Sequence, residues 1–379
     1  MLHLPQRDLA RVPRQERLKE PPWMITSIQL RSFKGHRDTT VPLGRLTVLV
    51  GPNGTGKTSV LQALNLMDRL MNEQPFVVLR GDMSPQDLLR RSEQEPITLA
   101  AEGTDDAHAW RLAIQFSRPT SDEHQRIKVN WSYGENQGGV ETLAIPPVRK
   151  LASVIGPAVL YHFDARRISA TAYSSEENPA VDADGSNTAV ALAALKLERE
   201  EAFEQIESEL RRIVPSIQRI RVRRVKMSQS PNQTEPPIGN KVFIDFKDAP
   251  DVPAHGASEG TLITLALLTA LCSPNRPRLL LLDDIDQSLH PQAQMELMGE
   301  LKRLLESFPE VQLVATTHSP YILDALDPSD VRVFAPRKDG SVACRSLSEH
   351  PQAEKMRGVL TAGQLWSLDP EWRWVVGEQ

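Results

Sequence analysis

Cysteine, aromatic residues and long apolar runs are all scarce in this chain of 379 residues. Its two cysteines, Cys272 and Cys344, provide neither a disulfide framework nor a zinc site, and they predict a reducing, cytoplasmic setting. Aromatic residues make up 5%, too few to favour a stacking platform for single-stranded nucleic acid. No apolar run approaches the roughly 18 residues that a membrane span needs, so we expect no contact with a membrane.

Strong charge is also absent, because the formal net charge is −5 and does not indicate a polyanion partner. With 40% hydrophobic and 25% charged residues, the composition is that of an ordinary globular protein. The length suits two domains, or one large α/β domain with an insertion. Residues 1–23 are polar and contain several prolines, which predicts a flexible N-terminal tail. No heptad repeat is present, which excludes long coiled-coil arms.

The strongest motif lies at residues 46–59, where a buried strand, a glycine-rich loop and a helix follow one another. Gly51, Gly54 and Gly56 allow the loop to turn its backbone N–H groups toward an anion. Lys57 can reach the β- and γ-phosphates of a nucleotide, and the Thr58 hydroxyl can ligate Mg²⁺. We therefore expect ATP and Mg²⁺ to bind here, with the nucleotide held by Asn53, Gly54, Thr55, Gly56, Lys57, Thr58 and Ser59.

Two further segments carry groups that suit the same chemistry. The apolar run 278–282 predicts a strand that ends in Asp283, a candidate Mg²⁺ ligand, and Asp284, which can polarise the attacking water. Ser258 and Gly260 begin an apolar helix, and a helix N-terminus attracts anions. The alternative for Ser258 is a plain N-cap.

Hydrophobic patterning gives a coarse map of the remaining elements. We predict one continuous helix over 188–213 and a short helix near 354–360. The predicted strands lie at 25–33, 39–43, 46–50, 76–79, 97–101, 110–116, 127–131, 140–144, 158–163, 218–226, 241–246, 311–316 and 331–335. Antiparallel strands that lead directly into a P-loop strand are unusual for a plain GTPase-like fold.

The entry strand and the order of these motifs resemble the ABC-type ATPase heads of the RecF/OLD-like AAA family. The entry-strand residues that match the family are Ile25, Ile28, Leu30, Phe33 and Lys34. The resemblance covers about residues 24–379. It implies an α/β, P-loop NTPase fold, namely an ABC-ATPase-like head with an antiparallel β subdomain and a helical/β insertion at 175–250.

The same resemblance implies roles for particular residues. Ser258 and Gly260 would act as the signature motif, which completes the nucleotide site of a second subunit. His318 would be the switch histidine that hydrogen-bonds the γ-phosphate and, with Lys57 and Asp284, would belong to the catalytic set. His290 would belong to the loop that crosses the dimer interface, or would instead cap or pack a helix.

Two parts of the family pattern differ or stay open. Asp284 stands where the family has Glu, one methylene longer. That change could slow hydrolysis, move the base role partly to Asp286, or leave a protein that holds ATP as a clamp. The glutamine that senses the metal in this family has three candidates here, Gln86, Gln94 and Gln115.

Together these features predict an ATPase that forms a head-to-tail homodimer or higher oligomer around ATP and controls a separately encoded nuclease or toxin in DNA repair or antiviral defence. About 60 residues follow His318, too few for the TOPRIM nuclease domain of full-length OLD proteins. The alternatives are a non-hydrolysing ATP-gated scaffold, a DNA-binding clamp, and an ABC transporter ATPase. The spacing of 201 residues from Lys57 to Ser258 exceeds the usual transporter spacing.

Arginine recurs at alternate positions of the predicted strand 218–226. Arg219, Arg221 and Arg223 share one face, because side chains on a strand alternate between its two sides. Such a row could bind a DNA backbone or an acidic partner. The alternative is an ordinary solvated strand face.

Overall fold

A computed structural model describes most of the chain. The described residues are 18, 23–90, 95–105, 108–116, 127–141, 146–176, 178–226, 238–274, 276–287 and 289–377. Of the predicted tail 1–23, only Leu18 and Trp23 are therefore described. Trp23 is buried, and its indole N–H donates to the Glu310 carbonyl oxygen at 3.1 Å. No helix in these ranges is both long and apolar enough to cross a membrane.

The central sheet is mostly parallel and carries the P-loop strand in its interior. Its strand order is β15-β14-β3-β13-β12-β8, and β15 alone runs antiparallel. The strands are β3 (Leu46–Val50), β8 (Ala158–Tyr161), β12 (Leu279–Leu282), β13 (Gln312–Thr316), β14 (Val331–Pro336) and β15 (Val342–Ser346). Every residue of β3, β12 and β13 is buried, as expected for parallel strands covered on both faces.

A second sheet of six antiparallel strands contains the predicted entry strand. Its order is β2-β1-β4-β5-β6-β7. The strands are β1 (Met24–Phe33), β2 (His36–Pro42), β4 (Ile97–Thr104), β5 (Ala109–Phe116), β6 (Ile127–Tyr133) and β7 (Asn136–Val140). The predicted antiparallel β subdomain is confirmed. Of the predicted strand 140–144, only Val140 lies in a strand, as the last residue of β7; Glu141 is in a bend, and residues 142–144 lie outside the described residues.

Gln312 joins the two sheets. It is fully buried, and its amide oxygen accepts from Ile25 N at 3.0 Å while its amide nitrogen donates to Ile25 O at 2.7 Å and to Gly44 O at 2.9 Å. A buried side-chain amide that hydrogen-bonds both the N–H and the C=O of one residue links the two sheets in the way that a backbone residue of a neighbouring strand would.

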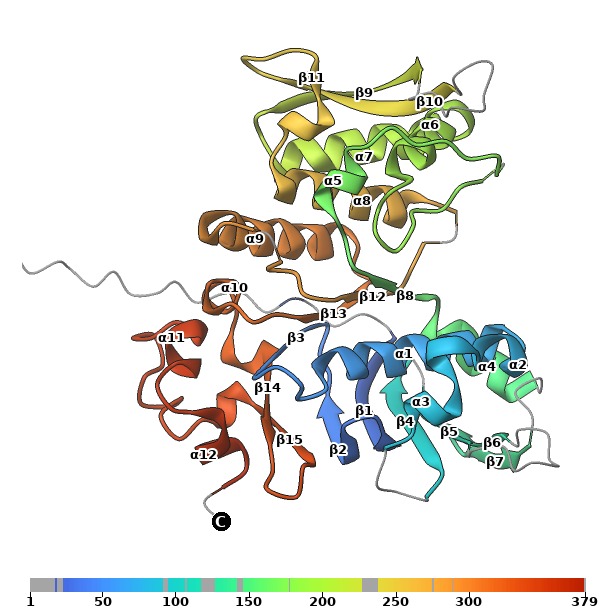
Figure 1. Cartoon of the computed structure of the whole chain (residues 1–379), viewed down its shortest axis with the longest axis vertical. Coiled ribbons are helices and arrows are strands. Elements are labelled where there is room, and N and C mark those ends of the chain that lie inside the picture. Colours follow the sequence, from blue (N-terminus) through green and yellow to red (C-terminus); the bar gives the residue numbers. More distant parts are fainter. Residues whose placement is uncertain are drawn as a thin grey trace, which may run out of the picture.

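Helices cover both faces of the central sheet (Figure 1). On one face, α1 (Lys57–Asn72) and α4 (Pro146–Ile155) pack with the antiparallel sheet into one apolar core. On the other face, a second core contains α8 (Glu259–Cys272), α9 (Pro291–Ser307) and α10 (Pro320–Asp324). Figure 1 accordingly shows α1 and α8 on opposite sides of the sheet.

A smaller three-stranded sheet lies above α6 and α7 in Figure 1. Its order is β11-β10-β9, with β9 (Ile217–Lys226), β10 (Ile238–Phe246) and β11 (Val252–Pro253). It packs on α6 (Thr188–Glu198) and α7 (Glu200–Ile213). These elements overlap the predicted insertion at 175–250, whose boundaries stay a prediction.

Three local predictions were wrong. The helix predicted over 188–213 is two helices, because Arg199 between them adopts the non-helical φ of −142° and ψ of 65°. Residues 76–79 belong mostly to the short helix α2 (Pro75–Val78), where Pro75 occupies the first helical turn. Residues 354–360 form turns rather than a helix, and Gly358 has a φ of +74°.

Short helices complete the described fold. They are α3 (Pro85–Leu88), α5 (Ala165–Ile168), α11 (Ala362–Trp366) and α12 (Glu371–Val375). Four 3₁₀ helices, at Gly81–Met83, Ala254–Gly256, Pro328–Asp330 and Leu347–Glu349, lie between the other described elements.

Candidate functional site

The P-loop connects the carboxyl end of β3 to α1. Gly51, Gly54 and Gly56 have φ values of +143°, +77° and +79°, a region that side chains disfavour. A Cβ on Gly51 would lie 2.4 Å from the Phe334 carbonyl oxygen, so the loop also needs glycine for space. Asn53 and Gly54 are exposed, whereas Thr55 is buried and its hydroxyl donates to Pro52 O at 2.8 Å.

The N-terminus of α1 fits an anion. Its N-cap is Gly56, which offers no side-chain acceptor to the N–H groups of the first turn. Those N–H groups and the helix dipole together favour a phosphate at this point. The residues present therefore suit the nucleotide that the sequence predicts.

Lys57 folds back over the loop. It is 5% exposed, and its ammonium donates to Gly51 O at 2.8 Å and to Pro52 O at 3.0 Å. Burial lowers the pKa of Lys57, and the carboxylates of Asp284 and Asp283 oppose that shift. The ammonium is thus held at the loop by weak neutral acceptors, which a phosphate could replace.

The predicted metal ligands lie next to each other, although they are far apart in sequence. The Thr58 hydroxyl, in the first turn of α1, donates to Asp283 Oδ1 at 3.0 Å. The Thr316 hydroxyl at the end of β13 donates to the same oxygen at 2.6 Å. No group of three or more His, Cys, Asp or Glu side chains suited to a metal occurs within the described ranges. Mg²⁺ typically takes one or two protein oxygens together with phosphate and water, so this pair fits Mg²⁺.

Thr316 is a site residue that the sequence did not single out. Besides holding Asp283, its hydroxyl oxygen accepts from the backbone N–H of Asp284 at 2.8 Å. A threonine at the end of a buried strand carries no motif of its own. Its position two residues before His318 was the one available signal.

Asp284 and His318 face each other at the carboxyl ends of β12 and β13. Asp284 Oδ1 lies 3.8 Å from His318 Nε2, and both side chains are 39% exposed. Asp284 adopts a left-handed φ of +48°, a conformation that Asp tolerates better than most residues and that is common at functional sites. This pair stands beside the Thr58–Asp283 contact, because Asp283 immediately precedes Asp284.

The Asp286 carboxylate accepts hydrogen bonds from the turn that carries His318. One of its oxygens, Oδ1, accepts from the Thr317 hydroxyl at 2.6 Å and from the His318 backbone N–H at 3.1 Å. These bonds favour a positioning role for Asp286 over a share of the base role. His290 caps α9, since its Nδ1 accepts from Gln292 N at 3.4 Å.

The predicted signature residues lie at the N-terminus of α8, a helix that Figure 1 shows across the central sheet from α1. Ser258 is exposed and caps α8, with its Oγ accepting from Thr261 N at 3.2 Å. Gly260 is buried against Glu300, whose Oε2 would lie 3.6 Å from an added Cβ. Within one chain Ser258 therefore acts as a plain N-cap, and a contact between Ser258 and the nucleotide of a second copy stays a prediction.

The arginine row on β9 is partly neutralised by the chain itself. Arg221 donates twice to Asp245 Oδ2, at 2.8 and 2.5 Å, and Arg223 donates to Asp251 Oδ2 at 2.9 Å. The hydrogen bond from the Asp251 backbone N–H and the Arg221 guanidinium lower the pKa of Asp245. Arg219 is exposed. DNA binding by this row stays a prediction, with less free charge than the sequence suggested.

The three candidate glutamines are not distinguished by the fold. Gln86 is exposed on α3, and Gln115 lies half-buried on β5 of the antiparallel sheet. Gln94 lies outside the described residues.

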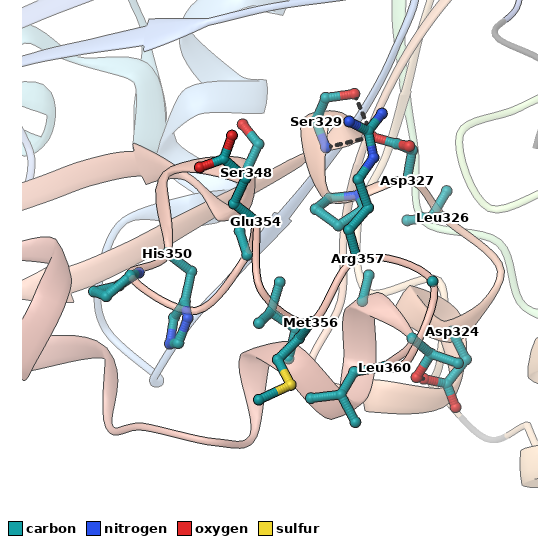
Figure 2. Close-up of a pocket in the computed structure, with 17 residues that line it drawn as sticks. Asp324, Leu326, Asp327, Ser329, Ser348, His350, Glu354, Met356, Arg357 and Leu360 are labelled. Carbon is teal, nitrogen blue, oxygen red and sulfur yellow. Dashed lines mark hydrogen bonds between the residues drawn. The ribbon is translucent and has the colours of Figure 1, made fainter. Parts of the chain in front are cut away.

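A cavity of about 550 Å³ lies elsewhere, between α10, α11 and the turns at 348–362. Figure 2 shows Arg357 reaching across it toward Asp327 and Ser329, with Met356 and Leu360 along the opposite part. None of the predicted nucleotide residues lines this cavity. This cavity is therefore separate from the candidate nucleotide residues, and a smaller pocket is lined by Asp283 and Asp284.

Comparisons with known proteins give three kinds of match. Residues 46–324 match a family model described as "AAA domain, putative AbiEii toxin, Type IV TA system". Over 66 residues the chain is 41% identical to the OLD nuclease of Thermus scotoductus, covering 17% of this chain and 12% of that one. Over 108 residues it is 30% identical to the Septu protein PtuA of Bacillus mycoides, covering 27% and 15%. The matched segments thus span a small part of these relatives.

A solved structure of an Smc head bound to the C-winged helix domain of ScpA is similar in fold. The TM-score is 0.54, over 86% of this chain and 98% of that one, at 14% identity. This likeness supports an ABC-ATPase-type head as the fold, in agreement with the sequence-based expectation.

Proposed function

We propose, from the family to which this chain belongs, that it binds and hydrolyses ATP between two copies of itself. That family is the AAA-domain family described as putative AbiEii toxin, Type IV TA system. The observation that carries the proposal is the convergence of Lys57, the Thr58–Asp283 contact and the Asp284–His318 pair around the end of one sheet. These are the parts that phosphoryl transfer requires.

Each part has a distinct task in this proposal. The loop N–H groups and Lys57 bind the phosphates, and Thr58 with Asp283 would hold Mg²⁺, which supplies positive charge beside the phosphate oxygens. Asp284 orients the attacking water and accepts its proton. His318 donates to the γ-phosphate, and its own backbone N–H is held by Asp286.

An ATPase assay tests the catalytic part. We expect phosphate release by the wild-type protein, loss of binding and hydrolysis in Lys57→Ala, and loss of hydrolysis alone in Asp284→Asn. A wild-type protein that binds ATP with the same low phosphate release as Asp284→Asn would instead indicate the ATP-gated scaffold.

Pairing of two copies is tested by complementation. Lys57→Ala retains an intact Ser258, and Ser258→Arg retains an intact P-loop. Each variant alone should be inactive if the two groups act on one nucleotide across an interface. In an equal mixture, half of the dimers are mixed and each has one intact site, so about a quarter of the wild-type activity should return. A mixture as inactive as its components would contradict a shared site.

In this proposal the ATPase cycle controls the activity of a partner protein. One relative is named an OLD nuclease, and we extend that link to control of a separately encoded nuclease or toxin in DNA repair or antiviral defence. Purification of the tagged chain with ATP, using Asp284→Asn to prolong the ATP-bound state and Lys57→Ala as control, should enrich one effector in an ATP-dependent manner. Equal recovery with both variants would count against ATP-gated control.

A further inference from the structure

The tip of the β1–β2 hairpin lies directly against the P-loop. His36, the first residue of β2, is 0% exposed, and its Nε2 lies 3.0 Å from the carbonyl oxygen of Gly56. Gly56 is the last loop residue and the N-cap of α1. This histidine belongs to none of the motifs that the sequence revealed.

The contact is tight. A Cβ on Gly56 would lie 2.4 Å from His36 Nε2, so the imidazole occupies the space that any other residue at position 56 would need. The His36 ring meets Phe334 edge to face, with centroids 6.4 Å apart and planes at 81°. Phe334 in turn closes against Gly51 at the other end of the loop. The two ends of the P-loop thus pack against neighbouring residues, the His36 side chain of β2 and the backbone of Phe334 in β14.

The hydrogen-bonding pattern selects one form of the imidazole. A carbonyl oxygen can only accept, so Nε2 carries the proton and donates to Gly56. Nδ1 is buried and has no hydrogen-bond partner among the described residues. Burial lowers the pKa of His36, and the charge of Arg90 lowers it further, against the opposing effect of the Gly56 contact. The ring is therefore neutral at physiological pH.

The hairpin tip that carries His36 is itself firmly held. Arg90 donates through its backbone N–H to Ser32 O at 3.0 Å and through its guanidinium to Gly35 O at 2.9 Å. The Lys34 ammonium donates to Gln62 on α1. A fixed hairpin, rather than a mobile side chain, thus supports the loop.

We propose that His36 is a positioning residue of the nucleotide site, whose neutral imidazole holds the Gly56 carbonyl and keeps the P-loop in its open, phosphate-accepting shape before nucleotide arrives. The expected effect on ATP affinity rests on the proposed function, because a preformed loop increases affinity only if the loop binds ATP. The preformed shape itself is a property of the nucleotide-free protein. His36 acts through Gly56 and touches no reacting atom.

The test uses the full chain and three substitutions. His36→Gln keeps an N–H donor at the position of Nε2, whereas His36→Leu removes it and His36→Asn places its amide one bond too short to reach Gly56. His108→Leu, at the residue immediately before β5, is the control for loss of a histidine outside the loop contact. Hydrogen exchange of the peptide spanning residues 50–60 is measured without nucleotide, and Kd for a fluorescent ATP analogue, KM and kcat are measured with Mg²⁺.

We expect His36→Leu and His36→Asn to speed exchange in this peptide and to raise Kd and KM about fivefold to tenfold, the effect of one lost hydrogen bond. We expect kcat to stay within about twofold, because the catalytic groups are untouched. His36→Gln should return all values to near those of the wild type, and His108→Leu should change none.

Equal impairment of His36→Gln and His36→Asn would overturn the proposal, as would a folded His36→Asn protein with wild-type exchange and affinity. Should the wild-type protein bind no ATP, the proposed function fails. The exchange measurement on nucleotide-free protein still decides whether His36 holds the loop.

Discussion

Asp68 carries the most quantitative prediction, because it places a carboxyl group on the buried face of α1. The residue is 8% exposed. Burial raises its pKa from the ordinary 3.8 to about 6, although hydrogen bonds from the Ala158 backbone and from the Asn72 amide, the latter to Asp68 Oδ1 at 3.0 Å, act in the opposite direction. No part of the proposed mechanism uses this carboxyl group. We therefore expect Asp68→Asn to raise stability without changing ATP hydrolysis.

The size and sign of the effect follow from proton linkage. Raising the pKa from 3.8 to about 6 corresponds to about 3 kcal/mol between the ionised and neutral carboxyl group. Below about pH 4 the group is protonated in the folded and unfolded states alike. Between about pH 4 and pH 6 the folded state keeps a proton that the unfolded state has released, so this contribution to stability is lost as the pH rises.

Asparagine keeps an oxygen that can accept from Asn72 and never ionises. The free energy of unfolding of Asp68→Asn minus that of the wild type should therefore be near zero at pH 4. It should rise to about 2–3 kcal/mol at pH 7.5, slightly less than the full linkage value because the amide is itself polar and buried.

Urea unfolding followed by tryptophan fluorescence at pH 4, 5, 6 and 7.5 measures this difference directly. Asp248→Asn, at an exposed position, is the matched control and should give a difference near zero throughout. A difference for Asp68→Asn that does not vary with pH, or a variant less stable than the wild type at pH 7.5, would refute the burial argument.

Three further predictions concern the candidate site. Asp284→Asn should lower kcat by about 10²- to 10⁴-fold with ATP affinity retained, and Asp284→Glu should raise kcat above the wild-type value if the shorter side chain limits hydrolysis; steady-state assays and ATP-analogue binding check both. Thr316→Val removes the hydroxyl shared by Asp283 and the backbone of Asp284, so thermal unfolding should show a loss of about 1–2 kcal/mol and kcat should fall more than KM rises. Gly51→Ala places a methyl group against the Phe334 carbonyl oxygen at a disfavoured φ, so stability should fall by about 2 kcal/mol or more, and a wild-type melting temperature would show that this contact does not constrain the loop.

Elements with strong local signals were predicted well. The strand 46–50 has the observed bounds of β3, since an unbroken apolar run followed by glycine has few alternative structures. The predicted strand at 76–79 failed, because a short apolar run suits a helix equally well once Pro75 supplies the first turn. The helix predicted near 354–360 failed for a tertiary reason. Its apolar residues Met356 and Leu360 line the cavity of Figure 2 instead of one helical face.

The break at Arg199 has no local signal. Neither glycine nor proline marks it, and the apolar positions on both sides continue at helical spacing. Packing of α6 and α7 as separate helices in one core decides it.

The sequence by itself determined the chemical groups of this protein and their order along the chain. A glycine loop after a strand, and carboxylates or a histidine at the ends of later strands, are short-range patterns that the local backbone specifies. The tertiary structure alone decided which groups meet. The parallel register of β12, β13 and β3 brings Thr58, Asp283 and Thr316 together.

Long-range packing also placed His36 under Gly56 and set Asp245 against Arg221. Neither contact could be foreseen, because side-chain partners that are distant in sequence depend on sheet order and register, which local patterns leave undetermined. The P-loop is thus predictable from the sequence, whereas the His36 contact that supports it depends on the tertiary structure.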